Sequence, residues 1–177
     1  DTVAAQGFKR RDDCHGWMGV RFQTEPLVEP SQILIHVRLL DKENLQQQEA
    51  LGIIGVNLVH QALYLHERRN DFVLPLLDNL TSDRVEVDMM ALSGPAFEGI
   101  DGRLGSLDLV AHGLTRAAMF HPDGNVIQAA DVLHGNCILL ERGSFRPITR
   151  VTVDMLGCAR AQFILDPRVK DQPVVEI

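Results

Sequence analysis

One stretch of the sequence combines residue types that suit phosphate binding. The apolar residues 138–140 are followed by Gly143, and a helical pattern begins at Thr149. A glycine after a buried strand lets the backbone approach a ligand closely. The first turn of a helix presents free N–H groups and the positive end of its dipole to an anion. Three arginines add positive charge: Arg142, Arg146 and Arg150. The stretch therefore predicts a site for a small phosphorylated ligand.

The same stretch resembles a known nucleotide-binding motif. It reads Gly143-Ser144-Phe145-x-Pro147-Ile148-Thr149-x-x-Thr152, which is similar to the first motif of the nicotinate and nicotinamide nucleotide adenylyltransferases. The resemblance implies binding of ATP with Mg²⁺ and transfer of an adenylyl group to a mononucleotide. No residue of the stretch is expected to bind the metal directly. The implied catalytic residues are Thr149 and Thr152, and the implied cofactor contacts are Gly143, Ser144, Phe145, Arg146 and Arg150.

The stretch departs from that motif in informative ways. Thr152 stands where the family has a histidine that contacts the phosphates, and Arg146 stands where it has Asp or Asn. The family's second signature, Ile-Ser-Ser-Thr-x-x-Arg, is absent from the sequence. In that family the motif opens the Rossmann sheet, whereas only 28 residues follow Thr149 in this 177-residue chain. Two alternatives remain open: the chain is a fragment of a longer protein, or the match is coincidental.

The chain as a whole also resembles a set of bacterial proteins of unestablished function. The matching stretches are residues 13–17, 44–58 and 93–97. Members of that set are longer, and they are labelled nicotinate-nucleotide adenylyltransferase or TonB-dependent receptor. The receptor label implies many alternating strands of about ten residues, which this sequence does not contain. We therefore reject the receptor label. The adenylyltransferase label rests on the Gly143 motif, so the two resemblances are not independent of each other.

Other residues with chemical potential lie on expected strands. Glu86 and Asp88 are two residues apart on one strand face, where they form either a carboxylate pair for acid–base work or a solvated face. His36 shares a strand face with Arg38. A histidine there is either an acid or base or a half-buried structural residue.

A helix expected within residues 45–67 supports an alternative function. Its apolar residues recur at three- and four-residue steps, which predicts a helix packed on a sheet. Asn57 and Gln61 interrupt the apolar pattern, and we expect their amides to bind neighbouring backbone or a polar ligand. Gly52 and Gly55 allow another backbone to approach closely. The alternative reading is therefore a non-catalytic module for self-association or protein interaction, in which the chain is a homo-oligomer.

The pattern of elements predicts the fold class. Expected strands lie at 17–23, 33–40, 84–92, 116–120, 126–128 and 137–140, and expected helices at 45–67, 103–112 and 149–165, with short helical turns at 72–80 and 129–134. Strands that alternate with helices indicate an α/β fold. We expect a mixed, mostly parallel sheet flanked by helices, with at least one hairpin, in a single domain of residues 1–177.

Composition limits the partners. The chain carries 17 basic and 24 acidic residues, a net charge of −7, which argues against nucleic acid because phosphate backbones require a basic face. No apolar run reaches the roughly 18–20 residues that span a bilayer, and no signal-peptide pattern is present. The three cysteines are too few for a disulfide framework. We therefore expect a cytoplasmic protein with reduced thiols and no membrane contact.

Overall fold

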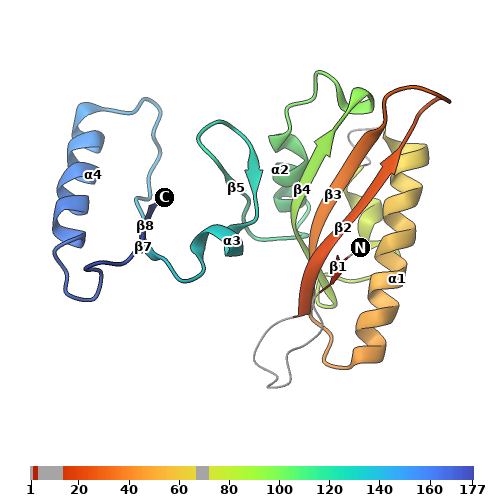
Figure 1. The fold of residues 1–177 in the computed structure, drawn as a ribbon, viewed down its shortest axis with the longest axis horizontal. Helices are drawn as coiled ribbons and strands as arrows, with labels where there is room; N and C mark the ends of the chain where they lie inside the picture. Colours follow the sequence, from red (N-terminus) through yellow and green to blue (C-terminus); the bar gives the residue numbers. More distant parts are fainter. Residues whose placement is uncertain (1, 4–13, 67–71) are drawn as a thin grey trace. The chain divides into compact units, whose positions relative to one another are not determined.

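The computed structural model describes residues 2–3, 14–66 and 72–177, and the chain forms two compact units. Unit 1 comprises Asp1–Gln128 and unit 2 comprises Ala129–Ile177, whereas the sequence pattern predicts a single domain of residues 1–177. Unit 1 contains a four-stranded sheet with helices, and unit 2 contains a two-stranded sheet with one long helix (Figure 1).

The sheet of unit 1 is antiparallel throughout. Its strands follow chain order: β1 (Thr2–Val3), β2 (Cys14–Phe22), β3 (Ser31–Leu39) and β4 (Val85–Ser93). The expectation of a mostly parallel sheet is wrong. The connection after β3 leaves the sheet at Leu39 and returns beside it, with Leu39 paired to Val85, so β4 starts at the end of the sheet where β3 stops. If β4 ran parallel to β3, the connecting chain would have had to travel back to the opposite end of the sheet before β4 began.

Helix α1 (Asn44–His60) covers one face of this sheet (Figure 1). A π-helical turn, Gln61–Leu65, continues it. This confirms the expected helix as far as residue 66, while residue 67 lies outside the described residues. The buried side chains of α1 and its extension recur every three or four residues: Gln47, Ala50, Ile54, Leu58, Gln61 and Ala62. They pack on the alternate, inward-facing residues of the strands, among them Met18, Ile33, Ile35, Val37, Val85, Val87 and Met90.

The pairing of β3 with β4 is interrupted by a β-bulge. His36 pairs with Met89, whereas the next residue of β3 pairs with Val87, so Asp88 is the extra residue. Simple alternation along the expected strand 84–92 would place Met89 on the face of Val87, but the bulge moves it to the opposite face. Beyond the bulge the alternation reverses, so Met90 belongs to the core shared with Val87.

Helix α2 (Arg103–Ala111) covers the outer edge of β4. The buried hydroxyl of Ser106 bonds both the backbone N–H and the backbone C=O of Met90, at 3.1 Å each. Further along the edge, the backbone N–H of Val87 donates to the carbonyl of Leu114 over 3.3 Å. These three edge groups of β4 are therefore satisfied by α2 and the segment after it.

A short hairpin completes unit 1. Strands β5 (Met119–Phe120) and β6 (Val126–Ile127) pair in antiparallel fashion, which confirms the hairpin expected at residues 116–128. The turn between them is closed by a hydrogen bond from the His121 N–H to the carbonyl of Asn125, 2.8 Å long. A 3-10 helix (Leu74–Leu77) lies where a short helix was expected.

Unit 2 is a strand–helix–strand arrangement. A short helix, α3 (Ala129–Leu133), leads to β7 (Cys137–Leu139), and helix α4 (Arg150–Phe163) is followed by β8 (Val174–Glu176). Strands β7 and β8 are parallel neighbours. This is the one parallel pair among the described strands. The expected strand at 137–140 and the expected helix at 149–165 are confirmed.

Candidate functional site

The residues proposed from the sequence lie on the loop between β7 and α4. This loop, residues 140–149, leaves the carboxyl end of β7 and enters the N-terminus of α4. In sheets with parallel strands, ligands bind beyond the carboxyl ends of the strands, and helix N-termini bind anions. The order of strand, glycine loop and helix expected from the sequence is therefore present.

Thr149 begins helix α4 as its N-cap. Its Oγ1 accepts a hydrogen bond from the backbone N–H of Thr152, at 3.3 Å, which satisfies one of the free donors of the first turn. The two hydroxyl oxygens, Thr149 Oγ1 and Thr152 Oγ1, lie 3.0 Å apart. One hydroxyl hydrogen lies between them, so the other hydrogen remains for a ligand oxygen. The structure thus brings the two expected catalytic threonines together.

Gly143 and Phe145 pack against each other within the loop. A Cβ atom placed on Gly143 would lie 3.1 Å from two ring atoms of Phe145, so a side chain at this position would displace the ring. Phe145 also lines a cavity of about 310 Å³. The other lining residues are Glu141, Ile148, Thr152, Val153, Leu156, Glu176 and Ile177.

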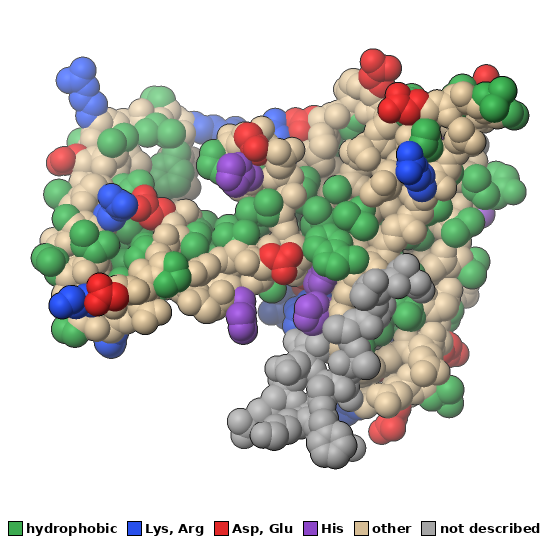
Figure 2. All heavy atoms as spheres, viewed as in Figure 1, with side chains coloured by type: hydrophobic (Ala, Val, Ile, Leu, Met, Phe, Trp, Pro, Cys, Tyr) green, Lys and Arg blue, Asp and Glu red, His purple; other side chains and the backbone are tan. Residues whose placement is uncertain are grey.

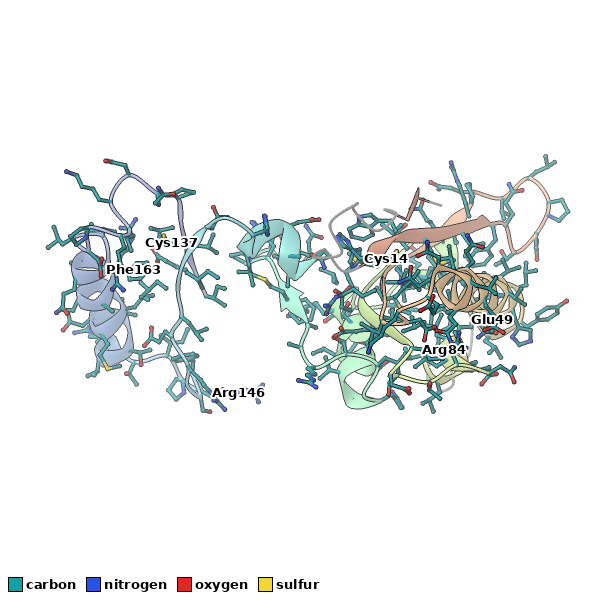
Figure 3. All side chains as sticks on the ribbon, turned by 90° about the horizontal axis from the view of Figure 1, so that it is seen from below. Cys14, Glu49, Arg84, Cys137, Arg146 and Phe163 are labelled. Carbon is teal, nitrogen blue, oxygen red and sulfur yellow. The ribbon has the colours of Figure 1, made fainter. Side chains whose placement is uncertain are left out.

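The remaining expected residues do not line this cavity. Thr149 and Arg150 line a separate groove of about 560 Å³ along α4, and Ser144 and Arg146 are exposed on the loop. Figure 3 shows Arg146 on this loop. The structure therefore brings Phe145 and Thr152 to one cavity but leaves the other expected contacts on open surface.

Three arginines in and just after the loop differ from the other arginines of unit 2. Arg160 bonds Glu176 at 2.5 Å, and Arg168 bonds Asp166 at 2.7 Å. No ion pair is found within the described residues for the three expected phosphate-binding arginines, which are Arg142, Arg146 and Arg150. Their positive charges therefore remain available to an anionic ligand.

The described residues do not form a metal-binding cage. Among residues 14–66 and 72–177, no group of three or more His, Cys, Asp or Glu side chains is arranged to hold a metal ion. Mg²⁺ bound to nucleotides is commonly held by the phosphates and one or two carboxylates. Two carboxylates line the cavity, but Glu176 is already paired with Arg160. The residues of this cavity therefore do not fit a resident Mg²⁺.

The other candidates from the sequence lie in unit 1. The Asn57 amide donates to the carbonyls of Leu76 and Asp78, at 3.0 and 2.9 Å, which confirms the expected contact with neighbouring backbone. Gln61 is buried, and neither atom of its amide has a hydrogen-bond partner in the described structure. The backbone contact expected for Gln61 is therefore not formed there.

The expected pair of Glu86 and Asp88 separates into two partnerships. Glu86 accepts from Arg38 Nη1 at 2.6 Å, and Asp88 Oδ1 lies 2.6 Å from His36 Nδ1. The two carboxylates therefore do not act as one acid–base pair. No pattern in the sequence indicated the contact between His15 and His36, which lies on the neighbouring strand. Strand pairing alone would have revealed this contact, because the two residues carry no recognisable motif.

None of the three cysteines forms a disulfide in the described structure: Cys14 is buried, Cys137 is partly buried and Cys158 is exposed. In the described parts of the chain, no helix has the length and apolar character needed to cross a membrane.

Comparisons with protein-family models, with curated proteins and with solved structures found no match for this chain.

Proposed function

We propose that unit 2 binds a nucleotide or a similar small phosphorylated ligand, as a domain related to nicotinate-nucleotide adenylyltransferases. The observation that carries the proposal is the position of the Gly143 loop between a parallel strand and the N-terminus of α4. Phosphate groups bind at this position because N–H groups and the helix dipole face them. The unpaired charges of the loop arginines support the same ligand chemistry.

The proposed ligand has two parts that meet different surfaces. Its phosphates lie on the loop, where Arg146 and Arg150 neutralise charge and the paired hydroxyls of Thr149 and Thr152 donate one hydrogen bond. Its ring occupies the cavity beside Phe145, whose 310 Å³ lies at the lower end of ligand-pocket sizes. Thr152 supplies a neutral hydroxyl where the related enzymes use histidine, so it orients a phosphate without adding charge. This proposal includes a cytoplasmic location and no nucleic-acid partner.

Calorimetric titration with ATP, nicotinate mononucleotide and inorganic phosphate tests the binding. We expect ATP to bind and Arg146→Ala to raise its Kd about tenfold or more, because a hydrogen bond to a charged group contributes about 1.5–3 kcal/mol. Arg168→Ala is the matched control, since Arg168 is already paired with Asp166, and its Kd should equal that of the wild type. Absence of ATP binding, or an equal loss in both variants, refutes the site.

A separate measurement tests adenylyl transfer. Pyrophosphate release from ATP with nicotinate mononucleotide and Mg²⁺ is expected if the domain is catalytic. If ATP binds but no pyrophosphate is released, the proposed binding function stands and the proposed adenylyl transfer is refuted.

The surface of α1 favours a second candidate function, self-association. Val56 and Tyr64 are each 70% exposed, and Leu45 is 78% exposed. Val56 and Gly52 line a shallow groove of about 550 Å³, and a Cβ on Gly52 would meet no atom within 4 Å. A second copy of the chain would cover this apolar surface. Sedimentation equilibrium should then show a dimer that Val56→Asp dissociates, and a monomer at all concentrations would refute this function.

A further inference from the structure

A chain of hydrogen-bonded polar side chains crosses the face of the unit 1 sheet that lies opposite α1. It begins at His15 on β2, continues through His36 on β3 and ends at Asp88 on β4. The distances are 3.0 Å from His15 Nδ1 to His36 Nε2 and 2.6 Å from His36 Nδ1 to Asp88 Oδ1. Gln128, which follows β6, donates its amide N–H to Asp88 Oδ2 over 3.0 Å.

These contacts determine where the protons lie. A carboxylate only accepts, so the short contact with Asp88 requires a hydrogen on His36 Nδ1. In neutral His36, Nε2 is then the acceptor, and His15 Nδ1 must donate to it. The remaining nitrogen, His15 Nε2, carries a lone pair. The amide nitrogen of Gln128 also lies 3.3 Å from His36 Nδ1, but this contact joins two donors and does not alter the assignment.

Burial separates the two ends of the chain. The side chain of His36 is 3% exposed and that of Asp88 is 17% exposed, whereas His15 is at the surface. The indole of Trp17 meets the ring of His36 edge-on, with centroids 4.9 Å apart. His15 is therefore the accessible end, and His36 and Asp88 are held beneath it.

On this sheet face, Arg38 pairs with Glu86, and Asp88 pairs with His36. Arg38 is the cross-strand partner of His15, and its charge is balanced by Glu86 at 2.6 Å. Thr115 Oγ1 donates a further hydrogen bond to Glu86, 2.8 Å long. Asp88 forms no ion pair with Lys or Arg within the described structure. Its negative charge is therefore available to stabilise a positive charge on His36.

We propose that His15 is a general base, positioned and strengthened by His36 and Asp88, that deprotonates a hydroxyl group of a small molecule or water. The O–H bond breaks, its electron pair stays on the oxygen, and the proton binds His15 Nε2. The proton on His15 Nδ1 passes to His36 Nε2, so the positive charge comes to rest on His36 beside the Asp88 carboxylate. Return of the proton reverses each step. Every residue of this site belongs to unit 1, whereas the phosphate loop belongs to unit 2.

The wild-type protein allows a first test that requires no substitution. Long-range ¹H–¹⁵N correlation spectra at neutral pH distinguish the two tautomers of each histidine. We expect the Nδ1–H tautomer at both His15 and His36. The Nε2–H tautomer at either residue would reverse the direction of the chain and overturn the proposal.

A second test measures the reactivity of His15 Nε2 with diethyl pyrocarbonate, with each modified histidine identified by peptide mass spectrometry. His121 is the internal control, because its Nδ1 lies 3.2 Å from Asp123 Oδ1 while both side chains are more than half exposed. We expect His15 to react about tenfold faster than His121, because the positive charge formed on reaction comes to rest on His36, which is hydrogen-bonded to Asp88. A hydrogen bond to a charged group contributes enough free energy for at least that factor.

Two matched substitutions complete the second test. Asp88→Asn should lower the rate at His15 to that of His121, and Asp123→Asn should leave both rates within about twofold, because solvent screens exposed pairs. The proposal is overturned if His15 reacts no faster than His121, or if the two substitutions have equal effects. If Asp88→Asn fails to fold, the tautomers and the wild-type rates still decide the question.

Discussion

Ser106 provides a sharp test of how the edge of β4 is stabilised. Its side chain is fully buried, and its Oγ lies 3.1 Å from both the backbone nitrogen and the backbone oxygen of Met90. Met90 is itself fully buried, so these two backbone groups are shielded from water. The substitution Ser106→Ala removes the hydroxyl while keeping the Cβ atom and the helix.

The expected loss of stability follows from these two contacts. A buried donor or acceptor left without a partner costs about 1–3 kcal/mol, so two such groups cost about 2–6 kcal/mol. Alanine has the higher helix propensity, which offsets about 0.5 kcal/mol. We expect the free energy of unfolding to fall by about 2–4 kcal/mol, because part of the gross cost is relieved by relaxation around the smaller side chain.

Urea unfolding monitored by tryptophan fluorescence measures this change. Trp17 is the single tryptophan of the chain and lies on β2, in the same unit as Ser106. With a slope of about 2 kcal/mol per molar urea, the midpoint should fall by about 1–2 M. Ser93→Ala is the control, because Ser93 is exposed at the end of β4. The reasoning is refuted if the two variants unfold at the same urea concentration, or if hydrogen exchange at the Met90 amide is unchanged in Ser106→Ala.

Three further outcomes are expected. Gln61→Leu should raise the free energy of unfolding by about 1–2 kcal/mol, because the buried amide has no partner among the described residues; a lower urea midpoint would contradict this. Gly94→Ala should lower it by about 2–3 kcal/mol, since Gly94 has a φ of 95° and a Cβ would lie 2.6 Å from Ser31 Cα; circular dichroism during thermal unfolding measures the loss. Hydrogen bonds from Arg103 lower the pKa of Asp101 to about 2. The contribution of this pair to folding stability is therefore complete above the ordinary carboxyl pKa of 3.8 and is lost as the pH falls through about 2. A carboxyl ¹³C titration of Asp101 should show a midpoint near 3.8 in Arg103→Ala, and an unchanged midpoint would refute the assignment.

Local patterns predicted the elements of unit 1 well, and non-local pairing was the part they could not predict. The alternation in residues 33–40 and the helical steps of 45–67 are short-range signals, and both elements are present. The direction of neighbouring strands depends on where the intervening chain returns. The return of the chain at Val85 beside Leu39 leaves no mark in residue spacing, so the alternation of strands and helices wrongly suggested a parallel sheet.

The two candidate sites also differ in whether their residues are close together in the sequence. The phosphate loop is contiguous, so its residues could be named from the sequence and were found in the expected order. The histidine chain joins residues separated by 21, 52 and 40 positions, and their proximity arises from strand register. Alternation alone placed Glu86 and Asp88 on one face, but it could not show that each carboxylate has a different partner across the sheet.

Helix α4 shows the limit of periodicity as a guide to burial. Apolar residues recur along it at helical spacing, yet none of its residues is buried. Val151, Val153 and Met155 are each more than half exposed, and hydrophobic side chains are visible over this unit in Figure 2. A stripe predicts which side of a helix is apolar, but burial also needs an opposing surface. A two-stranded sheet provides little such surface, so a pattern typical of a core helix is present here without a core.

Unit 2 has few buried side chains and the sheet of unit 1 has many, so we expect the two candidate sites to respond differently to a ligand. Ligand bound at one hundred times its Kd stabilises the folded state by about 2.7 kcal/mol, which is large for a unit whose helix has no buried residue. ATP bound at the Gly143 loop should therefore stabilise unit 2. It should also shield Cys158 from thiol reagents, because this exposed cysteine lines the α4 groove together with Thr149 and Arg150. The histidine chain rests on a well-packed sheet, so its proton positions should not depend on ATP. Protection of Cys158 with unchanged tautomers at His15 would separate the two sites experimentally, whereas tautomers that changed with ATP would contradict their independence.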